Sequence, residues 1–233
     1  MEHSLNLRKQ QALVDILIRS CPTNKKICAP HVLEHYDTIV PPTSAFLHRQ
    51  PKQKTVVCKT RMSLAETLFY TLSRCPASEY HGALFPYQVE IPDDDANHAN
   101  MVYLYFNKSH PLIRVHCYLI EPNGEAFTKK YPSGYNNLTR AWHYLCSHAR
   151  EALDVKLIRR VQVVGENVDR ESGLQTCLGS YRTRSLRIGA RLHNEVRRSG
   201  YGICGAVVFW LFRMWLRSSK DCTLDDYYKI LLR

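Results

Sequence analysis

The sequence contains no hydrophobic run long enough to cross a membrane. Its longest stretch without a charged residue lies between Arg198 and Arg213 and holds 14 residues, whereas a spanning helix needs about 20. The first twenty residues carry Arg, Lys and Asp among their apolar positions, so they lack the uninterrupted apolar core of a secretory signal. We therefore expect a protein that is not secreted and that has no membrane partner.

Glycine and proline are scarce, with 10 and 11 among 233 residues. This excludes a collagenous or low-complexity chain. A hydrophobic content of 45% is enough for a packed core and excludes wholesale disorder. The length fits one domain, or one domain with a small addition.

Clustered metal ligands are also missing. The nine cysteines are spread along the chain without any C-x-x-C spacing, which argues against structural zinc and gives no support to a disulfide scaffold. The pairs His31/His35 and His143/His148 lack the neighbouring acid of an H-E-x-x-H site, so we expect no metal. Most cysteines should be buried, unreactive thiols, and one could be a nucleophile.

Acidic residues are outnumbered, and the net charge is +11. Residues 156–217 contain twelve Lys or Arg against four Asp or Glu. Such a surplus predicts affinity for a polyanion, most simply nucleic acid, although a solvated basic face is the alternative. No base-reading motif is present, so binding would be to backbone phosphates. The densest basic segment contains Arg182, Arg184, Arg187, Arg191, Arg197 and Arg198.

The hydrophobic pattern predicts helices and strands in one α+β domain. Ser63 and Glu66 form a capping box for a helix over 63–75, and Asn136 or Asn137 should cap another that ends near Leu153. Further helices are expected over 1–20, from about 204 to 215 and from 223 onward. Strands are expected over 101–106, 112–120 and 158–164. We divide the chain into a helical or irregular extension, 1–90, and a core, 91–233.

The helix near residue 204 is apolar on all sides, so we expect it to be the buried central helix. Cys204 lies between Gly202 and Gly205 at its start. A helix N-terminus provides free N–H groups and positive potential, which lower a thiol pKa and supply oxyanion donors. A small core residue at a helix start is the plainer interpretation.

Two other residues fit the same chemistry. His98 lies where an acidic loop becomes a strand, and Glu121 ends the next strand. A carboxylate so placed could orient the imidazole, as a nucleophile–base–acid triad requires.

The segments HANMVYLYFN, VHCYLIEPNG, GLQT and GYGICGAVVFW together resemble the adenovirus-type cysteine proteases and their SUMO-specific relatives. They are closer still to related proteins of large DNA viruses. The similarity covers Asn97 to about Trp215, and residues 1–90 match no family. It implies a papain-like fold with permuted chain order, in which the central helix packs on a small antiparallel sheet.

The resemblance also implies roles for four residues. Cys204 would be the nucleophile, His98 the general base, Glu121 its orienting acid and Gln175 an oxyanion donor beside the Cys204 backbone N–H. Ala99 stands where this family commonly has Trp, and 29 residues separate Gln175 from Cys204.

Some alternatives stay open for these roles. Gln162 is the alternative to Gln175, and His110 and His116 are alternatives to His98.

Two functions follow as expectations. The first is a thiol peptidase that cleaves a viral precursor or a ubiquitin-like conjugate, without a cofactor other than nucleic acid as activator. The second is an inactive basic protein on the same fold that binds nucleic acid or forms part of a virion. The resemblance places either one in the host nucleus or cytoplasm, or in the virion.

Overall fold

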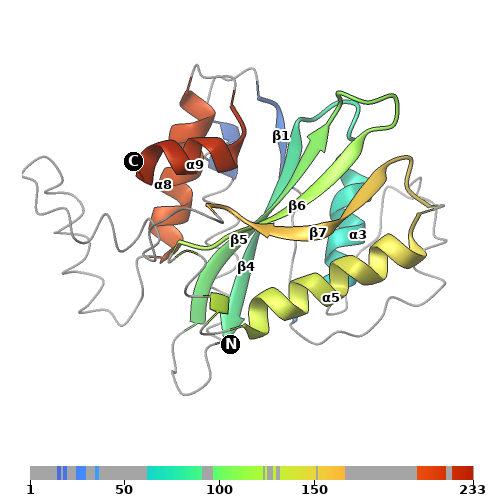
Figure 1. The fold of residues 1–233 in the computed structure, drawn as a ribbon, viewed down its shortest axis with the longest axis horizontal. Helices are drawn as coiled ribbons and strands as arrows, with labels where there is room; N and C mark the ends of the chain where they lie inside the picture. The colour runs from blue at the N-terminus through green and yellow to red at the C-terminus, as the bar shows by residue number, and fades with distance from the viewer. Residues whose placement is uncertain are drawn as a thin grey trace, which may run out of the picture.

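The computed structural model has a mixed sheet with helices on both faces (Figure 1). It describes residues 15–16, 18–19, 25–29, 35–36, 62–90, 97–122, 124, 128–129, 132–150, 152–165, 204–218 and 222–232. Residues 15, 16, 18 and 19 are helical, as predicted for part of 1–20. Gln175 and the arginine-rich segment 182–198 lie outside the described residues.

Five strands form the main sheet in the order β1-β4-β5-β6-β7. Their bounds are β1 Ile27–Cys28, β4 Gly82–Glu90, β5 Asn97–Asn107, β6 Arg114–Ile120 and β7 Lys156–Val163. A second sheet pairs β2, His35–Tyr36, with β3, Met62–Ser63.

The main sheet is mixed, which corrects the expectation of an antiparallel one. β4, β5 and β6 are antiparallel neighbours, but β1 joins β4 and β7 joins β6 in parallel. The parallel β6–β7 pair follows from chain connectivity, because the helix α5 (Ser133–His148) crosses between these strands. Parallel neighbours need such a crossover, whereas a short hairpin suffices for β5 and β6.

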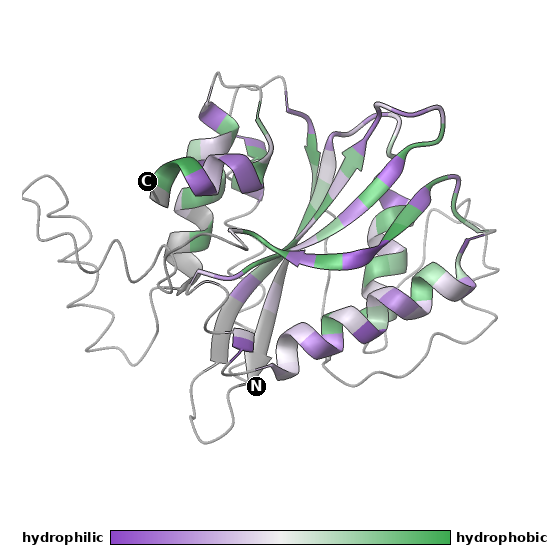
Figure 2. Ribbon diagram, viewed as in Figure 1, coloured by the Kyte–Doolittle hydropathy of each residue, from purple (hydrophilic) through white to green (hydrophobic). Residues whose placement is uncertain are grey.

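Helices cover the two faces of the sheet separately. α3 (Leu64–Arg74) and α5 lie on one face, and α8 (Cys204–Arg217) and α9 (Leu224–Leu232) lie on the other (Figure 1). Side chains alternate along each strand, and Figure 2 shows apolar and polar residues interleaved along β6 and β7.

Two apolar clusters result from this alternation. On β5, Val102, Leu104 and Phe106 join the cluster under α3 and α5. Met101 and Tyr103 join the cluster under α8 and α9. β5 therefore supplies both cores.

α8 covers one sheet face and is not enclosed on all sides, which corrects the prediction of a fully buried helix. Val208, Leu211, Phe212, Trp215 and Leu216 are buried. Arg213, Met214 and Arg217 are exposed on the outer side.

The predicted capping box is confirmed. Ser63 Oγ accepts from the Glu66 N–H at 3.2 Å, and Glu66 Oε2 accepts from the Ser63 N–H at 2.7 Å. The start of α5 was predicted wrongly, because its N-cap is Pro132 and not Asn136 or Asn137. Proline fixes a φ that suits the first helical turn, so α5 begins earlier without a side-chain cap.

β4 is a strand that the hydrophobic pattern did not reveal. It contains Pro86, and a proline inside an apolar run argues against a strand because it cannot donate a backbone hydrogen bond. β4 pairs with β5 from Gly82↔Tyr105 to Glu90↔Asn97, and its other side pairs with β1 only at Gly82 and Ala83 among the described residues. The expected boundary at residue 90 therefore falls between two paired strands of one sheet.

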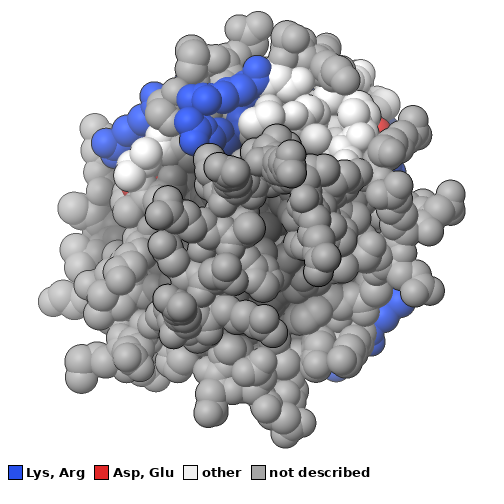
Figure 3. All heavy atoms as spheres, turned by 90° about the vertical axis from the view of Figure 1, so that its left-hand side faces the viewer, with Lys and Arg blue, Asp and Glu red and all other residues white. Residues whose placement is uncertain are grey.

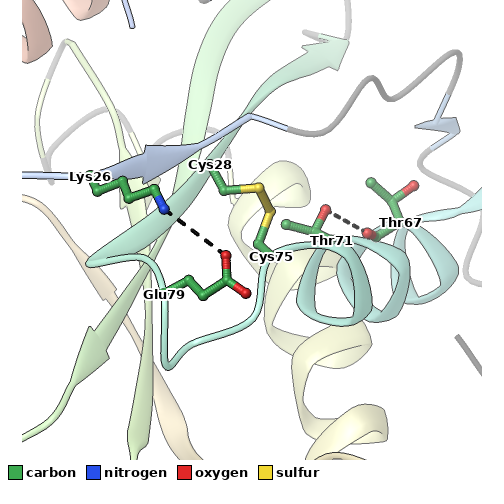
Figure 4. Close-up of a disulfide and its surroundings, with 6 residues drawn as sticks. All are labelled: Lys26, Cys28, Thr67, Thr71, Cys75 and Glu79. Carbon is green, nitrogen blue, oxygen red and sulfur yellow. Dashed lines mark hydrogen bonds and ion pairs between the residues drawn. A yellow bond between two sulfur atoms is a disulfide. The ribbon is translucent and has the colours of Figure 1, made fainter.

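Cys28 and Cys75 form a disulfide, although the sequence gave no support for one. The two Cα atoms are 5.7 Å apart and 47 residues separate the cysteines in the chain. The bond joins β1 to the residue that follows α3 (Figure 4). The two cysteines are far apart in the sequence, so their spacing did not predict the bond. The pairing of β1 with β4 brings them together.

None of the described helices is both long and apolar enough to span a bilayer.

α9 docks on the sheet through the turn after β7. Gly165 has φ +82°, and a Cβ built there would lie 2.1 Å from the Tyr228 ring. The Gly165 N–H donates to Asp225 Oδ1 at 2.7 Å. Glycine is required here both by the left-handed backbone and by the close approach of the ring.

Gly165→Ala should therefore destabilise the protein by roughly 2–4 kcal/mol, from left-handed strain together with overpacking. Chemical denaturation measures the free energy of unfolding. In a Tyr228→Ala background the same substitution should cost less, because only the backbone strain remains. Equal costs in the two backgrounds would show that α9 does not pack on Gly165.

Candidate active site

Glu121 directly follows β6 and is buried, with 1% of its surface exposed. Its carbonyl accepts from the Gly124 N–H at 3.0 Å, and Gly124 has φ +77°. This closes the tight turn expected for E-P-N-G. The turn fixes the carboxylate at the end of the strand and inside the protein.

His98 is the second residue of β5, where it pairs with Val89 of β4. The β5–β6 register runs to Met101↔Ile120. Glu121 follows Ile120 directly, so it lies just beyond the last pair of this register, and His98 lies three residues before Met101.

Cys204 is the first residue of α8, and the first turn of this helix contains no acidic residue. The positive end of the helix dipole therefore acts at position 204, and the first turn of α8 itself holds no carboxylate to offset it.

Buried neighbours of these three positions belong to one apolar cluster. Val208, one turn after Cys204, belongs to the cluster that contains Met101 and Ile120. Met101 follows His98 by three residues, and Ile120 immediately precedes Glu121. In Figure 1 the first turn of α8 lies toward the end of β6.

Strand alternation divides β5 between the two faces of the sheet. Met101 belongs to the α8 side of β5, whereas Val102 belongs to the α5 side. Asn100 has the parity of Val102, and its partner on β4, Tyr87, belongs to the α5-side cluster.

Asn100 is a polar residue of this region that the sequence reasoning missed. It is 4% exposed, and its Oδ1 has no hydrogen-bond partner among the described residues. Its neighbour on β4, Tyr87, donates its hydroxyl to the Gly134 carbonyl at 2.9 Å. An asparagine inside the otherwise apolar stretch after His98 was the available signal.

The alternative histidines lie elsewhere. His110 is exposed in the β5–β6 loop, at the opposite end of the hairpin from Glu121. His116 pairs with Tyr105. Gln162, by contrast, is the penultimate residue of β7 and pairs with Tyr118, toward the end of β6 that Glu121 follows. Topology thus favours His98 over the other two histidines.

Two other thiols are poor nucleophiles. Burial raises the pKa of Cys117 well above its usual value, and the neighbouring Cys146 adds to the rise. Burial also raises the pKa of Cys146 to about 11, against the opposing effect of Arg159. Neither would be ionised to a useful extent near neutral pH.

A ladder of polar aromatic residues occupies the sheet under α8 and α9. Tyr103 stacks on Tyr118 with ring centroids 6.3 Å apart, and His116 on Tyr118 at 6.4 Å. Burial raises the pKa of Tyr118 to about 12, with Asp225 contributing. Burial lowers the pKa of His116, and Arg114 lowers it further. His116 Nε2 has no hydrogen-bond partner among the described residues, and the lowered pKa favours the neutral ring.

Comparison with protein-family models, with curated proteins and with solved structures finds no match to this chain. Within the described parts of the chain, no group of three or more His, Cys, Asp or Glu side chains could hold a metal ion.

The half-buried His116 predicts a pH-dependent stability. Its folded pKa lies below the unfolded value of 6.5, so the unfolded state binds more protons below that pH. Stability should fall as the pH drops from about 6.5 through the folded pKa. Denaturation at pH 7.5 and 5.5 should show a smaller loss for His116→Gln than for the unmodified protein.

The exposed His110 provides the matched control. His110→Gln should retain the full loss of stability at pH 5.5. If His116→Gln lost as much, the ring would not be held neutral by its surroundings.

Proposed function

We propose that the protein is a cysteine peptidase in which Cys204 is the nucleophile, His98 the general base and Glu121 the orienting acid. The observation that supports this proposal is that Val208, Met101 and Ile120, which lie near the three positions in the chain, share one buried cluster. Cys204 is at a helix N-terminus, His98 near a strand start and Glu121 at a neighbouring strand end. Their order also matches the permuted papain-like pattern.

In this mechanism the Cys204 thiolate attacks the carbonyl carbon of the scissile bond. The oxyanion takes hydrogen bonds from the helix N-terminus and, by resemblance, from the Gln175 side chain. The C–N bond then breaks, and the imidazolium of His98 gives its proton to the departing amine. Water, deprotonated by His98, hydrolyses the thioester and regenerates the thiol.

Buried polar groups at this end of the sheet support the assignment. Glu121 and Asn100 are almost fully buried, and burial of such groups costs free energy unless their bonds are satisfied. Both can accept a hydrogen bond from an imidazole N–H, as the orientation of a catalytic histidine requires.

The substrate class proposed is a viral precursor protein or a ubiquitin-like conjugate. A ubiquitin-like protein that carries a C-terminal vinyl sulfone would then form an adduct on Cys204. This class rests on the resemblance of the four sequence segments.

Thiol alkylation against pH tests the nucleophile. With iodoacetamide and peptide mapping, Cys204 should react at least about tenfold faster at pH 7 than Cys146, whose pKa of about 11 leaves roughly one thiolate in ten thousand. His98→Ala should slow the reaction of Cys204 because the imidazolium no longer stabilises its thiolate. Cys204→Ser should abolish both the rapid labelling and adduct formation.

His110→Ala is the matched control, because this exposed histidine lies at the far end of the same hairpin. It should leave the labelling rate unchanged. Equal labelling of Cys204 and Cys146 in the native protein would overturn the catalytic assignment.

A second function, nucleic-acid binding, is favoured by the charge along the β6–β7 edge. Arg114 and Lys156 are directly opposite in the register, and Arg159 and Arg160 are exposed further along β7. Like charges placed opposite one another destabilise a sheet, whereas a polyanion would stabilise them. We propose that this edge contacts phosphates, either beside the peptidase activity or in its place.

The other side of the molecule is basic as well. Figure 3, which faces the α8–α9 side, shows Lys and Arg gathered over part of the described surface. Arg213 and Arg217 are exposed on α8. Arg213 and Arg217 therefore serve as a charge-matched comparison for Arg159 and Arg160 of β7.

Arg159→Gln with Arg160→Gln should weaken binding to duplex DNA and reduce the slope of log K against log salt by about 2, since each lost phosphate contact removes about 0.9. Fluorescence anisotropy across salt concentrations measures the slope. Arg213→Gln with Arg217→Gln removes the same charge from the opposite face and should change the slope less. Equal effects of both pairs would rule out a localised β7 contact.

A further inference from the structure

The segment Lys25–Cys28 connects three parts of the protein that are otherwise separate. It runs along the outer edge of β4, with α8 on one side of the sheet and α3 on the other (Figures 1 and 4). We call residues 25–28 the edge clamp. Its four residues contact the C-terminal end of α8, the edge of β4 and the residue that follows α3.

Lys25 holds the C-terminal end of α8. Its Nζ donates to the Trp215 carbonyl at 3.3 Å and to the Ser218 carbonyl at 3.1 Å. The same ammonium lies 5.1 Å from the centre of the Trp215 ring. A cation at a helix C-terminus satisfies carbonyls that lack intrahelical partners and complements the helix dipole.

Lys26 and Ile27 hold the sheet edge. The Lys26 N–H donates to His81 Nδ1 at 3.0 Å, and the His81 N–H donates to the Lys26 carbonyl at 2.7 Å. Ile27 is 5% exposed within the α8–α9 cluster. These non-covalent contacts are few, because β1 contains only two residues.

Cys28 supplies the covalent contact, through its disulfide with Cys75 at the end of α3 (Figure 4). Cys75 is fully buried, whereas Cys28 is half-buried. The disulfide is therefore attacked more easily at the Cys28 sulfur. A bond that closes so long a loop also restricts the unfolded chain strongly.

We propose that the edge clamp is controlled by thiol–disulfide exchange. With the Cys28–Cys75 bond formed, Lys25 is kept at the end of α8, and with the bond reduced the segment is released and the end of α8 loosens. Reduction consumes two molecules of a small cellular thiol: the first forms a mixed disulfide on Cys28 and frees the Cys75 thiol. The second frees Cys28 and leaves as the oxidised dimer of the small thiol.

Release of Lys25 would affect the apolar core, because Trp215 belongs to that core. The Trp215 ring packs edge-on against Tyr103 with centroids 5.6 Å apart and lies 5.3 Å from Phe212. Loosening the last turn of α8 therefore loosens its contact with β5. This inference concerns the fold and does not depend on the proposed peptidase activity.

Hydrogen exchange on the full chain in glutathione buffers of graded redox potential tests the proposal. Peptide mapping without reduction should identify the Cys28–Cys75 link in oxidising buffer. Reduction, or Cys28→Ser, should raise amide exchange near Trp215–Ser218 about tenfold and lower the melting temperature by about 10 °C. Cys146→Ser, which removes a thiol outside the disulfide, should change neither.

Substitution of Lys25 and of Lys26 distinguishes coupling between the disulfide and α8 from the general effect of losing a cross-link. Lys25→Met should raise exchange at the end of α8 while the disulfide is intact, and subsequent reduction should add little there. Lys26→Met should leave α8 unchanged, because Lys26 contacts Glu79 and Tyr80. Failure of the disulfide to form, or unchanged α8 exchange after reduction, would overturn the proposal.

Discussion

The antiparallel pairing of β5 with β4 and β6 is the constraint on which the rest of the structure depends. β5 is the middle strand, and its alternating side chains supply both apolar clusters. A slip of one residue would exchange Val102 with Tyr103 and place each in the wrong core. Because both faces are buried under helices, the register of β5 is strongly specified. That register also decides which residues meet at the end of the sheet.

Much of this arrangement follows from local sequence signals. The Ser63–Glu66 capping box and the apolar runs after His98 and before Glu121 gave the right elements, because caps and periodicity act within a few residues. β4 was missed since Pro86 interrupts its pattern, and the disulfide was missed since its cysteines are far apart in sequence. Such pairings depend on contacts between distant segments, which a single sequence does not display.

The candidate site likewise combines features that local sequence shows with features that depend on contacts between distant segments. Cys204 and Glu121 could be selected from local features, namely a glycine-flanked helix start and a strand end. The placement of Cys204 relative to that strand end could not, because it depends on how α8 crosses the sheet. Asn100 illustrates the difference, since its burial and the lack of a partner for its Oδ1 among the described residues are visible only in the structure.

α8 links the two ends of the molecule that carry the chemistry proposed here. It begins at Cys204, and carbonyls at its C-terminal end accept from Lys25. Between these ends, Val208, Phe212 and Trp215 pack on β5 and its neighbours. A helix held this way acts as a rigid unit, so the position of its first turn depends on the packing of its last. The contacts that Lys25 and β1 make at one end of α8 therefore influence where position 204 lies at the other end.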